Sequence, residues 1–527
     1  MGKPASVLPL FAALRNPACY PHPVRRVEVI ETHISWVLLT GEYAYKIKKP
    51  VFLGFADFTT LGLRRHYCEE EIRLNRRLAP QLYLDVVEIR GSPQAPRIGG
   101  KGPLIDYAVR MREFPQDALA SRSLDRHAFG AAEIDALAAR VAAFHAGAPA
   151  AGPRGPFGAP EAVFADAIQN FEQMQPLTGA SADDDALRSL RLWTEHEFAA
   201  RRKGFAVRKA QGRVRECHGD LHLGNIALIE GQPVPFDCIE FNDDLRWIDV
   251  MSEIAFAAMD LHDRGRSDLA WRFLNGYLET TGDYAGLDVL RFYLVYRALV
   301  RAKIHLIRSH QPNQTHNERL RLLQTFREYA RLADGFALPG HPALLLAHGL
   351  SGSGKTTLTQ PLIENLGAIR LRSDLERKRL HGLAPLASSV SAPGAGIYTR
   401  ESTVATYRRL GELAQDALRG GYPVVVDAAF LRRDEREAFR AIATDCGAPF
   451  LILDIQAPLE VLRARIEERR RRASDASEAD LAVLERQIEA REPLTPAEMD
   501  SAVAVDGTYP ATAEPWMPVI RLLCRTS

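Results

Sequence analysis

A strand leads into a glycine-rich turn in the stretch Ala343-Leu-Leu-Leu-Ala-His-Gly349-Leu-Ser-Gly-Ser-Gly354-Lys355-Thr356-Thr357. The apolar run is typical of a buried strand, and the apolar spacing from Leu358 to Leu366 is typical of a helix. A strand, a Gly-x-x-x-x-Gly-Lys-Thr turn and a helix, in this order, predict a P-loop. In such a loop the backbone N–H groups and the helix N-terminus hold phosphate oxygens.

The positions of this loop have separate expected tasks. Lys355 should reach the terminal phosphates, and the hydroxyl of Thr356 can bind Mg²⁺. Pro361, in the second turn of the expected helix, fits this pattern less well. A Gly/Ser-rich connector is the plainer interpretation, but it does not require Lys-Thr before a helix. We expect nucleotide contacts from Gly349, Ser351, Gly352, Ser353, Gly354, Lys355, Thr356 and Thr357.

Composition limits the classes of protein to consider. The chain has 527 residues, which is enough for more than one domain. Its net charge of +1 gives no overall indication of nucleic-acid binding. Its six cysteines form no C-x-x-C pair, which favours reduced thiols in the cytoplasm over disulfides or a zinc site. The most apolar segment, residues 287–307, contains four basic residues, so we expect no membrane span. Oligomeric state is left open.

Beyond the P-loop, strands and helices alternate. Apolar runs ending at residues 371, 426, 453 and 505 predict a parallel α/β sheet covered by helices, with ligands at the carboxyl ends of the strands. Two of these ends are followed by acids, Asp374 and Asp427. Either aspartate could instead cap a helix, which is a common task for this residue type.

The first half of the chain is predicted to begin with antiparallel strands. Residues 27–30, 34–39 and 43–47 have strand character, and residues 63–78 have the pattern of a helix. Further strands are expected at 86–89 and 108–111, before the period changes to helical near residue 131. A hairpin that ends in a lysine-bearing strand and is followed by a helix is what the small lobe of a kinase requires.

A polar segment follows, with the sequence His218-Gly-Asp220-Leu-His222-Leu-Gly-Asn225, and Asp237 lies a short distance beyond it. An aspartate, an asparagine five positions later and a second aspartate form an arrangement that serves phosphoryl transfer. Asp220 would take the proton of the acceptor hydroxyl, and the oxygen atoms of Asn225 and Asp237 would suit Mg²⁺. A polar turn between strands is the plainer alternative, and a structural role is favoured for His222.

The segment from His218 to Asn225 resembles the H-G-D-x-H-x-G-N loop of the aminoglycoside phosphotransferase and choline kinase group, a branch of the protein-kinase-like fold. Leu223 stands where that group usually has proline, which changes stiffness and removes no chemistry. The resemblance implies a bilobal fold. The implied roles are catalytic base for Asp220, metal ligands for Asn225 and Asp237, and structural support for Asp249 and His218.

The lysine-bearing strand has its own resemblance. Tyr43-Ala44-Tyr45-Lys46 is similar to the V-A-I-K strand of kinases, which implies that Lys46 binds phosphate, with Lys48 as the alternative. Glu71, on the following helix, is then the partner that holds the lysine. A solvated strand end and an exposed helix face are the plainer interpretations of these residues.

The second half resembles P-loop kinases of the polynucleotide kinase and gluconate kinase type, often grouped with AAA-like ATPases. The resemblance implies that Asp374 is the general base facing the acceptor hydroxyl and that Asp427 holds Mg²⁺ through water. The arginine-rich segment 463–472 resembles a lid that closes over the phosphates, with Arg465 and Arg469 as candidates. A solvated helix face is the alternative.

Together these patterns predict a two-domain kinase of mixed α+β and α/β class: a bilobal kinase-like domain over residues 1–335, a linker over 336–342 and an NMP-kinase-like P-loop domain over 343–527. Both domains are expected to use Mg²⁺ and ATP, with GTP left open, and to phosphorylate hydroxyl groups of small molecules. The acceptors do not follow from the fold. The alternatives are a nucleotide-dependent switch, in which the P-loop domain regulates the other, and a kinase of nucleic-acid 5′-hydroxyl ends.

Overall fold

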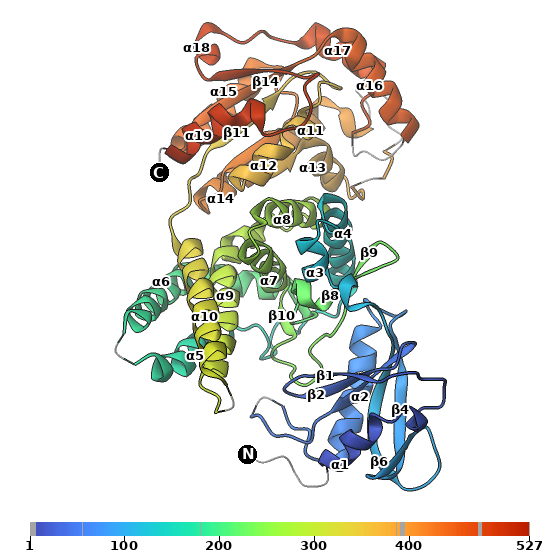
Figure 1. Cartoon of the computed structure of the whole chain (residues 1–527). Helices are drawn as coiled ribbons and strands as arrows, with labels where there is room; N and C mark the ends of the chain where they lie inside the picture. Colours follow the sequence, from blue (N-terminus) through green and yellow to red (C-terminus); the bar gives the residue numbers. More distant parts are fainter. Residues whose placement is uncertain are drawn as a thin grey trace. The chain divides into compact units, whose positions relative to one another are not determined.

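The computed structural model describes residues 7–54, 56–179, 181–312, 314–385, 387–389, 396–472 and 477–525. It divides into two compact units, whose helices and strands are labelled in Figure 1. Unit 1 consists of Met1–Val163 and Ala206–Ala257, and unit 2 consists of Phe164–Phe205 and Ala258–Ser527. The chain therefore passes between the units more than once. The predicted domain boundaries at 335 and 343 stay a prediction.

Unit 1 contains an antiparallel sheet of six strands in the order β1-β2-β3-β6-β4-β5. The predicted strands are present, β4 and β6 are longer than expected, and β5 was not expected. Helix α2, Leu61–Asn75, packs on β4 and β6. The strands are β1 Glu28–Glu31, β2 Ser35–Leu39, β3 Tyr43–Lys48, β4 Tyr83–Ser92, β5 Ala95–Ile98 and β6 Leu104–Arg112.

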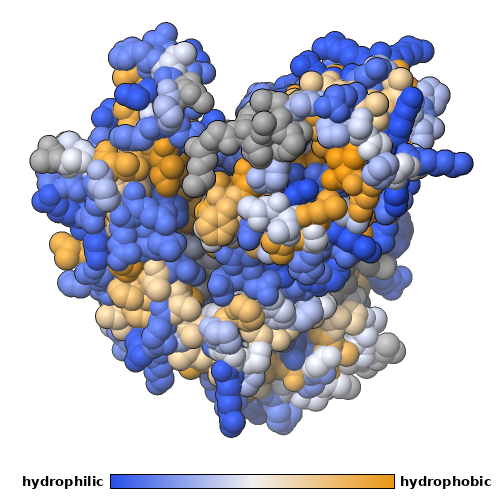
Figure 2. All heavy atoms as spheres, turned by 90° about the horizontal axis from the view of Figure 1, so that it is seen from below, coloured by the Kyte–Doolittle hydropathy of each residue, from blue (hydrophilic) through white to orange (hydrophobic). Residues whose placement is uncertain are grey.

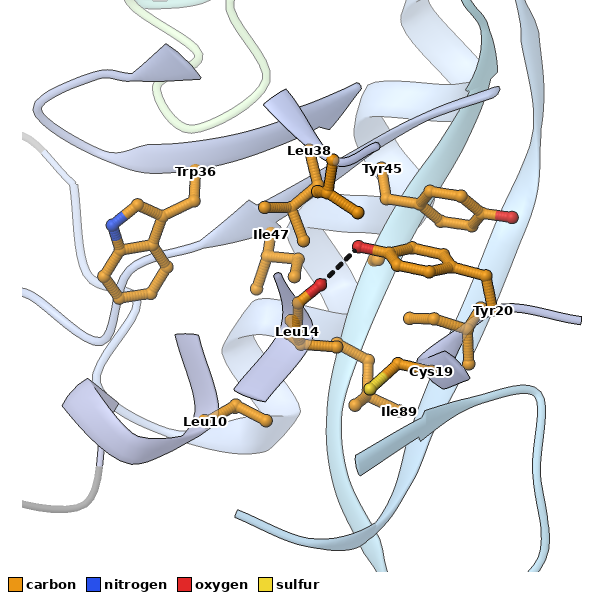
Figure 3. Close-up of a cluster of buried hydrophobic side chains, with 12 residues drawn as sticks. Leu10, Leu14, Cys19, Tyr20, Trp36, Leu38, Tyr45, Ile47 and Ile89 are labelled. Carbon is orange, nitrogen blue, oxygen red and sulfur yellow. Dashed lines mark hydrogen bonds between the residues drawn. The ribbon is translucent and has the colours of Figure 1, made fainter. Parts of the chain in front are cut away.

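Helix α1, Val7–Leu14, packs on one face of this sheet. Leu10 and Leu14 pack against Trp36, Tyr45 and Ile47 in a buried cluster (Figure 3). The hydroxyl of Tyr20, in the same cluster, donates a 2.8 Å hydrogen bond to the carbonyl of Leu14. Burial of these apolar side chains stabilises the sheet and fixes which face of β3 points toward α1.

The alternation of β3 explains where its lysines point. Tyr45 and Ile47 belong to the cluster under α1, whereas Ala44 belongs to the cluster that includes α2. Because side chains alternate between the faces of a strand, Lys46 and Lys48 lie on the same face as Ala44. Both lysines therefore point toward α2.

The rest of unit 1 places the polar segment 218–225 beside a hairpin. Strands β8 and β9 pair so that Ile226 is opposite Pro235. Asn225 before the hairpin and Phe236 after it are consequently adjacent, and the N–H of Phe236 donates to the carbonyl of Asn225 at 2.9 Å. The remaining elements are α3 Ala120–Asp125, α4 Ala131–Gly147, β7 Val214–Glu216, β8 Ile226–Ile229, β9 Gln232–Pro235, β10 Trp247–Asp249 and α7 Val250–Asp263, of which α7 crosses into unit 2.

Unit 2 contains a five-stranded sheet in the order β12-β13-β11-β14-β15, and every pair is parallel. This confirms the predicted α/β architecture. The strands are β11 Leu344–His348, β12 Ile369–Arg372, β13 Val424–Asp427, β14 Phe450–Gln456 and β15 Ala502–Asp506. The helices of this part are α13 Ser373–Leu380, α14 Arg400–Arg419, α15 Arg433–Asp445, α16 Leu459–Arg472, α17 Leu481–Ala490, α18 Pro496–Met499 and α19 Met517–Arg525.

The helix after the P-loop is interrupted. Helix α11 spans Lys355–Leu358 and α12 spans Gln360–Leu366, with Pro361 in the first turn of α12. Proline is favoured at such a position because its missing N–H would have no partner there. The misfit of Pro361 is therefore resolved by a second helix start.

Unit 2 also contains helices from the middle of the chain: α5 Pro160–Thr178, α6 Ala182–Ala210, α8 Ser267–Thr281, α9 Leu287–Ser309 and α10 His316–Ala337, with the start of α5 and the end of α6 in unit 1. Among the described residues, no helix combines the length and apolar character that a bilayer span needs. On the face drawn in Figure 2, hydrophobic patches are interrupted by hydrophilic residues.

Candidate functional site

The P-loop has the backbone that its sequence predicts. Gly352 and Gly354 have φ angles of +84° and +95°, which side-chain-bearing residues rarely adopt. A Cβ atom at Gly349 would lie 2.4 Å from the carbonyl oxygen of Ile455, so only glycine fits there. Lys355 Nζ donates to the carbonyls of Gly349 and Leu350 at 2.9 and 3.0 Å. These bonds fold the lysine back across the loop.

The site next to the loop suits a magnesium ion. Asp427 ends β13, beside β11, and its Oδ2 accepts a 2.5 Å hydrogen bond from the Thr356 hydroxyl. Two oxygen donors this close form the kind of ligand set that Mg²⁺ prefers. Burial lowers the pKa of Lys355, an effect that the nearby carboxylates of Asp427 and Asp374 only partly offset. A bound phosphate would supply the negative charge needed to balance the positive charge of the Lys355 ammonium group.

A cavity of about 630 Å³ opens over the loop. Asp374 lies in its wall, together with Lys355, Thr356 and Asp427. Helix α13 begins at Ser373 with Arg372 as its N-cap, and the next helix after Asp427, α15, has Arg432 as its N-cap. The capping alternative is therefore wrong for both aspartates. The structure instead brings both acids to one cavity.

Two arginines of α16 reach this cavity. Arg465 Nη1 lies 3.3 and 3.4 Å from the carbonyl oxygens of Gly352 and Ser353. Arg469 lines the same cavity and donates to the carbonyl of Ala479 at 2.7 Å. Gln487 of α17, which sequence reasoning missed, accepts a 2.8 Å bond from the N–H of Ser351. A lid role for either arginine stays a prediction.

Arg377 is a second residue that the sequence analysis missed. It follows Asp374 by one helical turn, lines the cavity and is 8% exposed. Its Nη1 donates to the Ile397 carbonyl and the Thr403 hydroxyl at 3.1 and 3.2 Å, while its Nε atom has no hydrogen-bond partner among the residues that the structure describes. Such a guanidinium is suited to an anionic group in the cavity. The i, i+3 spacing to Asp374 was the available signal.

The second constellation lies in unit 1, around Asp220. Asn225 Nδ2 donates to Asp220 Oδ2 at 2.9 Å and to the Asp220 carbonyl at 3.0 Å. The amide nitrogen is thereby used, and Asn225 Oδ1 is the atom able to ligate a metal. His218 Nε2 lies 2.9 Å from the Phe236 carbonyl oxygen, and burial lowers the pKa of His218. His222 Nδ1 accepts from the N–H of Gly224 at 3.0 Å, which gives this side chain a local structural contact.

Both candidate lysines contact Glu71. Lys46 Nζ lies 2.8 Å from Glu71 Oε1 and also pairs with Asp237, whereas Lys48 pairs with Glu71 and with Glu240. Glu71 is fully buried and Lys46 is 7% exposed, so neither is a solvated surface residue. Glu240 was missed by the sequence analysis. Lys46 is the lysine that reaches the predicted metal ligand.

The charges in this cluster compensate one another. Burial alone would lower the pKa of Lys46, but Asp237 and Glu71 outweigh it and hold that pKa well above its ordinary value. Burial alone would raise the pKa of Glu71, but the two lysines outweigh it and lower that pKa. The cluster is therefore charged, and a cation bound at Asp237 would compete with Lys46 for the carboxylate.

Support of the segment 218–225 comes from an unexpected residue. Asp249 accepts two 2.7 Å hydrogen bonds from Arg208 and a 2.9 Å bond from the Met251 N–H. Glu253 of α7 contacts the segment directly: it accepts from the Gly219 N–H at 2.7 Å and lies 2.9 Å from His145 Nε2. The sequence analysis missed Glu253, and support of the segment by Asp249 stays a prediction.

Comparison with known proteins gives two family matches. A model described as the phosphotransferase enzyme family matches residues 62–293, and a model described as an AAA domain matches residues 344–494. An uncharacterized protein of Mycobacterium tuberculosis is 31% identical over 464 residues, which cover 87% of this chain and 90% of that protein.

Two further relatives each match a part of the chain. The adenylyl-sulfate kinase of Myxococcus xanthus is 31% identical over 122 residues, or 23% of this chain and 62% of that protein. Among solved structures, an aminoglycoside phosphotransferase from Alicyclobacillus acidocaldarius is 15% identical, with a TM-score of 0.36, and the match covers 62% of this chain and 93% of that one.

Proposed function

We propose that this chain transfers phosphoryl groups at two separate sites. It belongs to the same family as its mycobacterial relative. It is an ATP-binding kinase in which a phosphotransferase-family domain is followed by a P-loop domain of the AAA type. Each site would use Mg²⁺ and phosphorylate a hydroxyl group of a small molecule. The proposal keeps the predicted boundaries, with domains over residues 1–335 and 343–527.

The observation that carries the proposal is the grouping around the P-loop cavity. Lys355 would hold the terminal phosphates, and Thr356 and Asp427 would hold Mg²⁺. The ion, when bound, would neutralise negative charge on the phosphates. Asp374, in the same cavity, would accept the proton of the acceptor hydroxyl as the oxygen attacks. Arg465 and Arg469 would stabilise the charge that develops on the transferred group.

The first domain would perform the same reaction with a different set of residues. Asp220 would orient the acceptor hydroxyl and take its proton, and Asn225 and Asp237 would hold the metal. Lys46 would hold the nucleotide phosphates, with Glu71 fixing the position of its ammonium group. The pairing of Lys46 with Asp237 supports this arrangement, because it brings the lysine to the proposed metal ligand.

The setting of the reaction is also a proposal. In the part of the chain that the structure describes, Cys19, Cys68, Cys217, Cys238 and Cys446 form no disulfide, which supports a reducing compartment such as the cytoplasm. The proposed acceptors are small molecules and not nucleic acid. The chain has 67 basic and 66 acidic residues, so it has no large net positive charge that would attract nucleic acid.

The purified chain, incubated with Mg²⁺ and terminally labelled ATP or GTP, tests this function. Pools of metabolites, nucleosides and oligonucleotides would be added separately. We expect label to move to compounds of the small-molecule pools, and phosphate release without an acceptor to be slow. Fast release that no pool changes would favour the switch instead. Label on oligonucleotide 5′ ends, together with salt-sensitive binding, would favour the nucleic-acid end kinase.

A further inference from the structure

Helix α8 covers the open edge of the P-loop sheet. Strand β12 is the edge strand, and the amide of Asn275 on α8 faces its free side. Asn275 Nδ2 donates to the Ala368 carbonyl at 3.0 Å, and its Oδ1 accepts from the Arg370 N–H at 2.7 Å. One side chain thus provides β12 with the two bonds that a neighbouring strand would make. Strand β12 leads directly to Asp374.

A charged contact extends from the same helix toward the P-loop. Glu279 Oε1 accepts from Arg370 Nε at 2.6 Å, and Glu279 Oε2 lies 3.6 Å from Arg372 Nη1. The side chains are 11–15% exposed, so solvent screens their charges only weakly. Glu279 is therefore the carboxylate shared by two arginines of β12.

The two arginines contact the proposed magnesium site. Arg370 Nη1 donates to the Thr356 carbonyl at 3.2 Å, and Arg372 Nε lies 3.9 Å from Asp427 Oδ2. Thr356 and Asp427 are the residues whose oxygens would hold the ion. Glu279 and the ion site are thus connected through Arg370 on one side and through Arg372 on the other.

We propose that Glu279 is a positioning residue for the P-loop reaction, an inference that rests on the metal-binding role proposed for Thr356 and Asp427. By balancing the charge of Arg370 and Arg372, Glu279 keeps Arg372 from forming a full ion pair with Asp427. The Asp427 carboxylate is then available to Mg²⁺. Without the charge at position 279, Arg372 is drawn to Asp427 and competes with the ion.

If Glu279 has this role, the P-loop site depends on a helix outside the P-loop segment of the sequence. Helix α8 lies within the 62–293 segment that matches the phosphotransferase family, yet it packs in unit 2 with the P-loop sheet. The magnesium requirement of the P-loop site is therefore set in part by a helix from the other domain's sequence. A change on α8 should alter that requirement without touching the P-loop itself.

The test uses the full chain and the Glu279→Gln variant, which keeps the size of the side chain and removes its charge. Binding of a fluorescent ATP analogue is titrated with Mg²⁺, and the P-loop signal is the part that Lys355→Ala abolishes. We expect the Mg²⁺ concentration for half-maximal binding to rise roughly 10-fold, the lower end of the loss seen when a direct partner of a metal ligand is removed, because Glu279 acts on Asp427 through Arg372. Glu279→Asp, which keeps the charge, should recover part of the loss.

The matched control is Asp268→Asn, which makes the same carboxylate-to-amide change. Asp268 lies near the start of α8 and forms a 2.8 Å ion pair with Arg266, whereas Glu279 lies near the end of the helix. This control should leave the magnesium requirement unchanged. The inference is overturned if Glu279→Gln behaves like this control, or if it weakens binding equally with and without Mg²⁺ while lowering the melting temperature. Absence of any Lys355-dependent binding in the wild type would instead overturn the proposed function, and this inference with it.

Discussion

Replacing Asp374 with alanine is expected to lower the rate of phosphoryl transfer at the P-loop site by roughly 10²–10⁴-fold, the usual effect of removing a general base. The carboxylate lies in the cavity wall with Lys355 and Asp427, where an acceptor hydroxyl would meet the terminal phosphate. Nucleotide binding should change little, because Lys355 and the loop backbone remain. Transfer of labelled phosphate to the identified acceptor measures the rate.

The same variant separates a kinase from a switch. A switch needs an ordered water molecule and no base for an acceptor. If phosphate release without acceptor were fast in the wild type and unchanged in Asp374→Ala, the P-loop half would be an ATPase. Thr356→Ala offers a comparison, because it should weaken metal-dependent nucleotide binding, which Asp374→Ala should preserve.

Replacing Asp220 with asparagine is expected to lower the rate of phosphoryl transfer at the first site by a comparable factor, roughly 10²–10⁴-fold. In the wild type, Asn225 Nδ2 lies 2.9 Å from Asp220 Oδ2. An asparagine at position 220 keeps the size of the side chain and can keep this contact through its amide oxygen, but it cannot accept the hydroxyl proton. The loop should therefore keep its shape while the chemistry stops. The rate of label transfer to the acceptor of the first domain provides the measurement.

Each of these two variants is a control for the other. Asp220→Asn should leave transfer at the P-loop site intact, and Asp374→Ala should leave transfer at the first site intact. If one substitution silenced both activities, the two reactions would be coupled. The regulatory alternative, in which the P-loop domain controls the first domain, would then be favoured.

Much of the fold follows from local patterns. The parallel sheet of unit 2 was predictable because each buried strand is a short apolar run, and the P-loop sits between a strand and a helix. Strand β5 was missed because Pro96 interrupts its four residues, Ala95–Ile98. The break at Thr359 was missed because the apolar spacing continues across it, although Pro361 marked a second helix start.

Site residues were predictable where they belong to one short motif with a fixed spacing. They were less predictable where the two residues in contact are far apart in the sequence and meet only after folding. Asp220 and Asn225 are five residues apart, and their contact follows from one loop. Glu240 and Lys48 are 192 residues apart, and Glu279 and Arg370 are 91 apart. Nothing in the sequence indicates which of the 67 basic residues each of these carboxylates will meet.

The choice between Lys46 and Lys48 shows the same limit. Strand alternation places both on the face of α2, so periodicity cannot separate them. The separation comes from Asp237, which contacts Lys46, and from Glu240, which occupies Lys48. Similarly, Glu253 rather than Asp249 contacts the Gly219 N–H because α7 brings it there.

Calorimetric titration of the full chain with a non-hydrolysable ATP analogue at saturating Mg²⁺ tests the existence of two nucleotide sites most directly. Two bound nucleotides per chain are expected in the wild type. Lys355→Ala should reduce this to one, because it removes the ammonium that faces the phosphates of the P-loop site. A single nucleotide per wild-type chain would contradict the proposal, leaving one kinase domain and one that does not bind ATP.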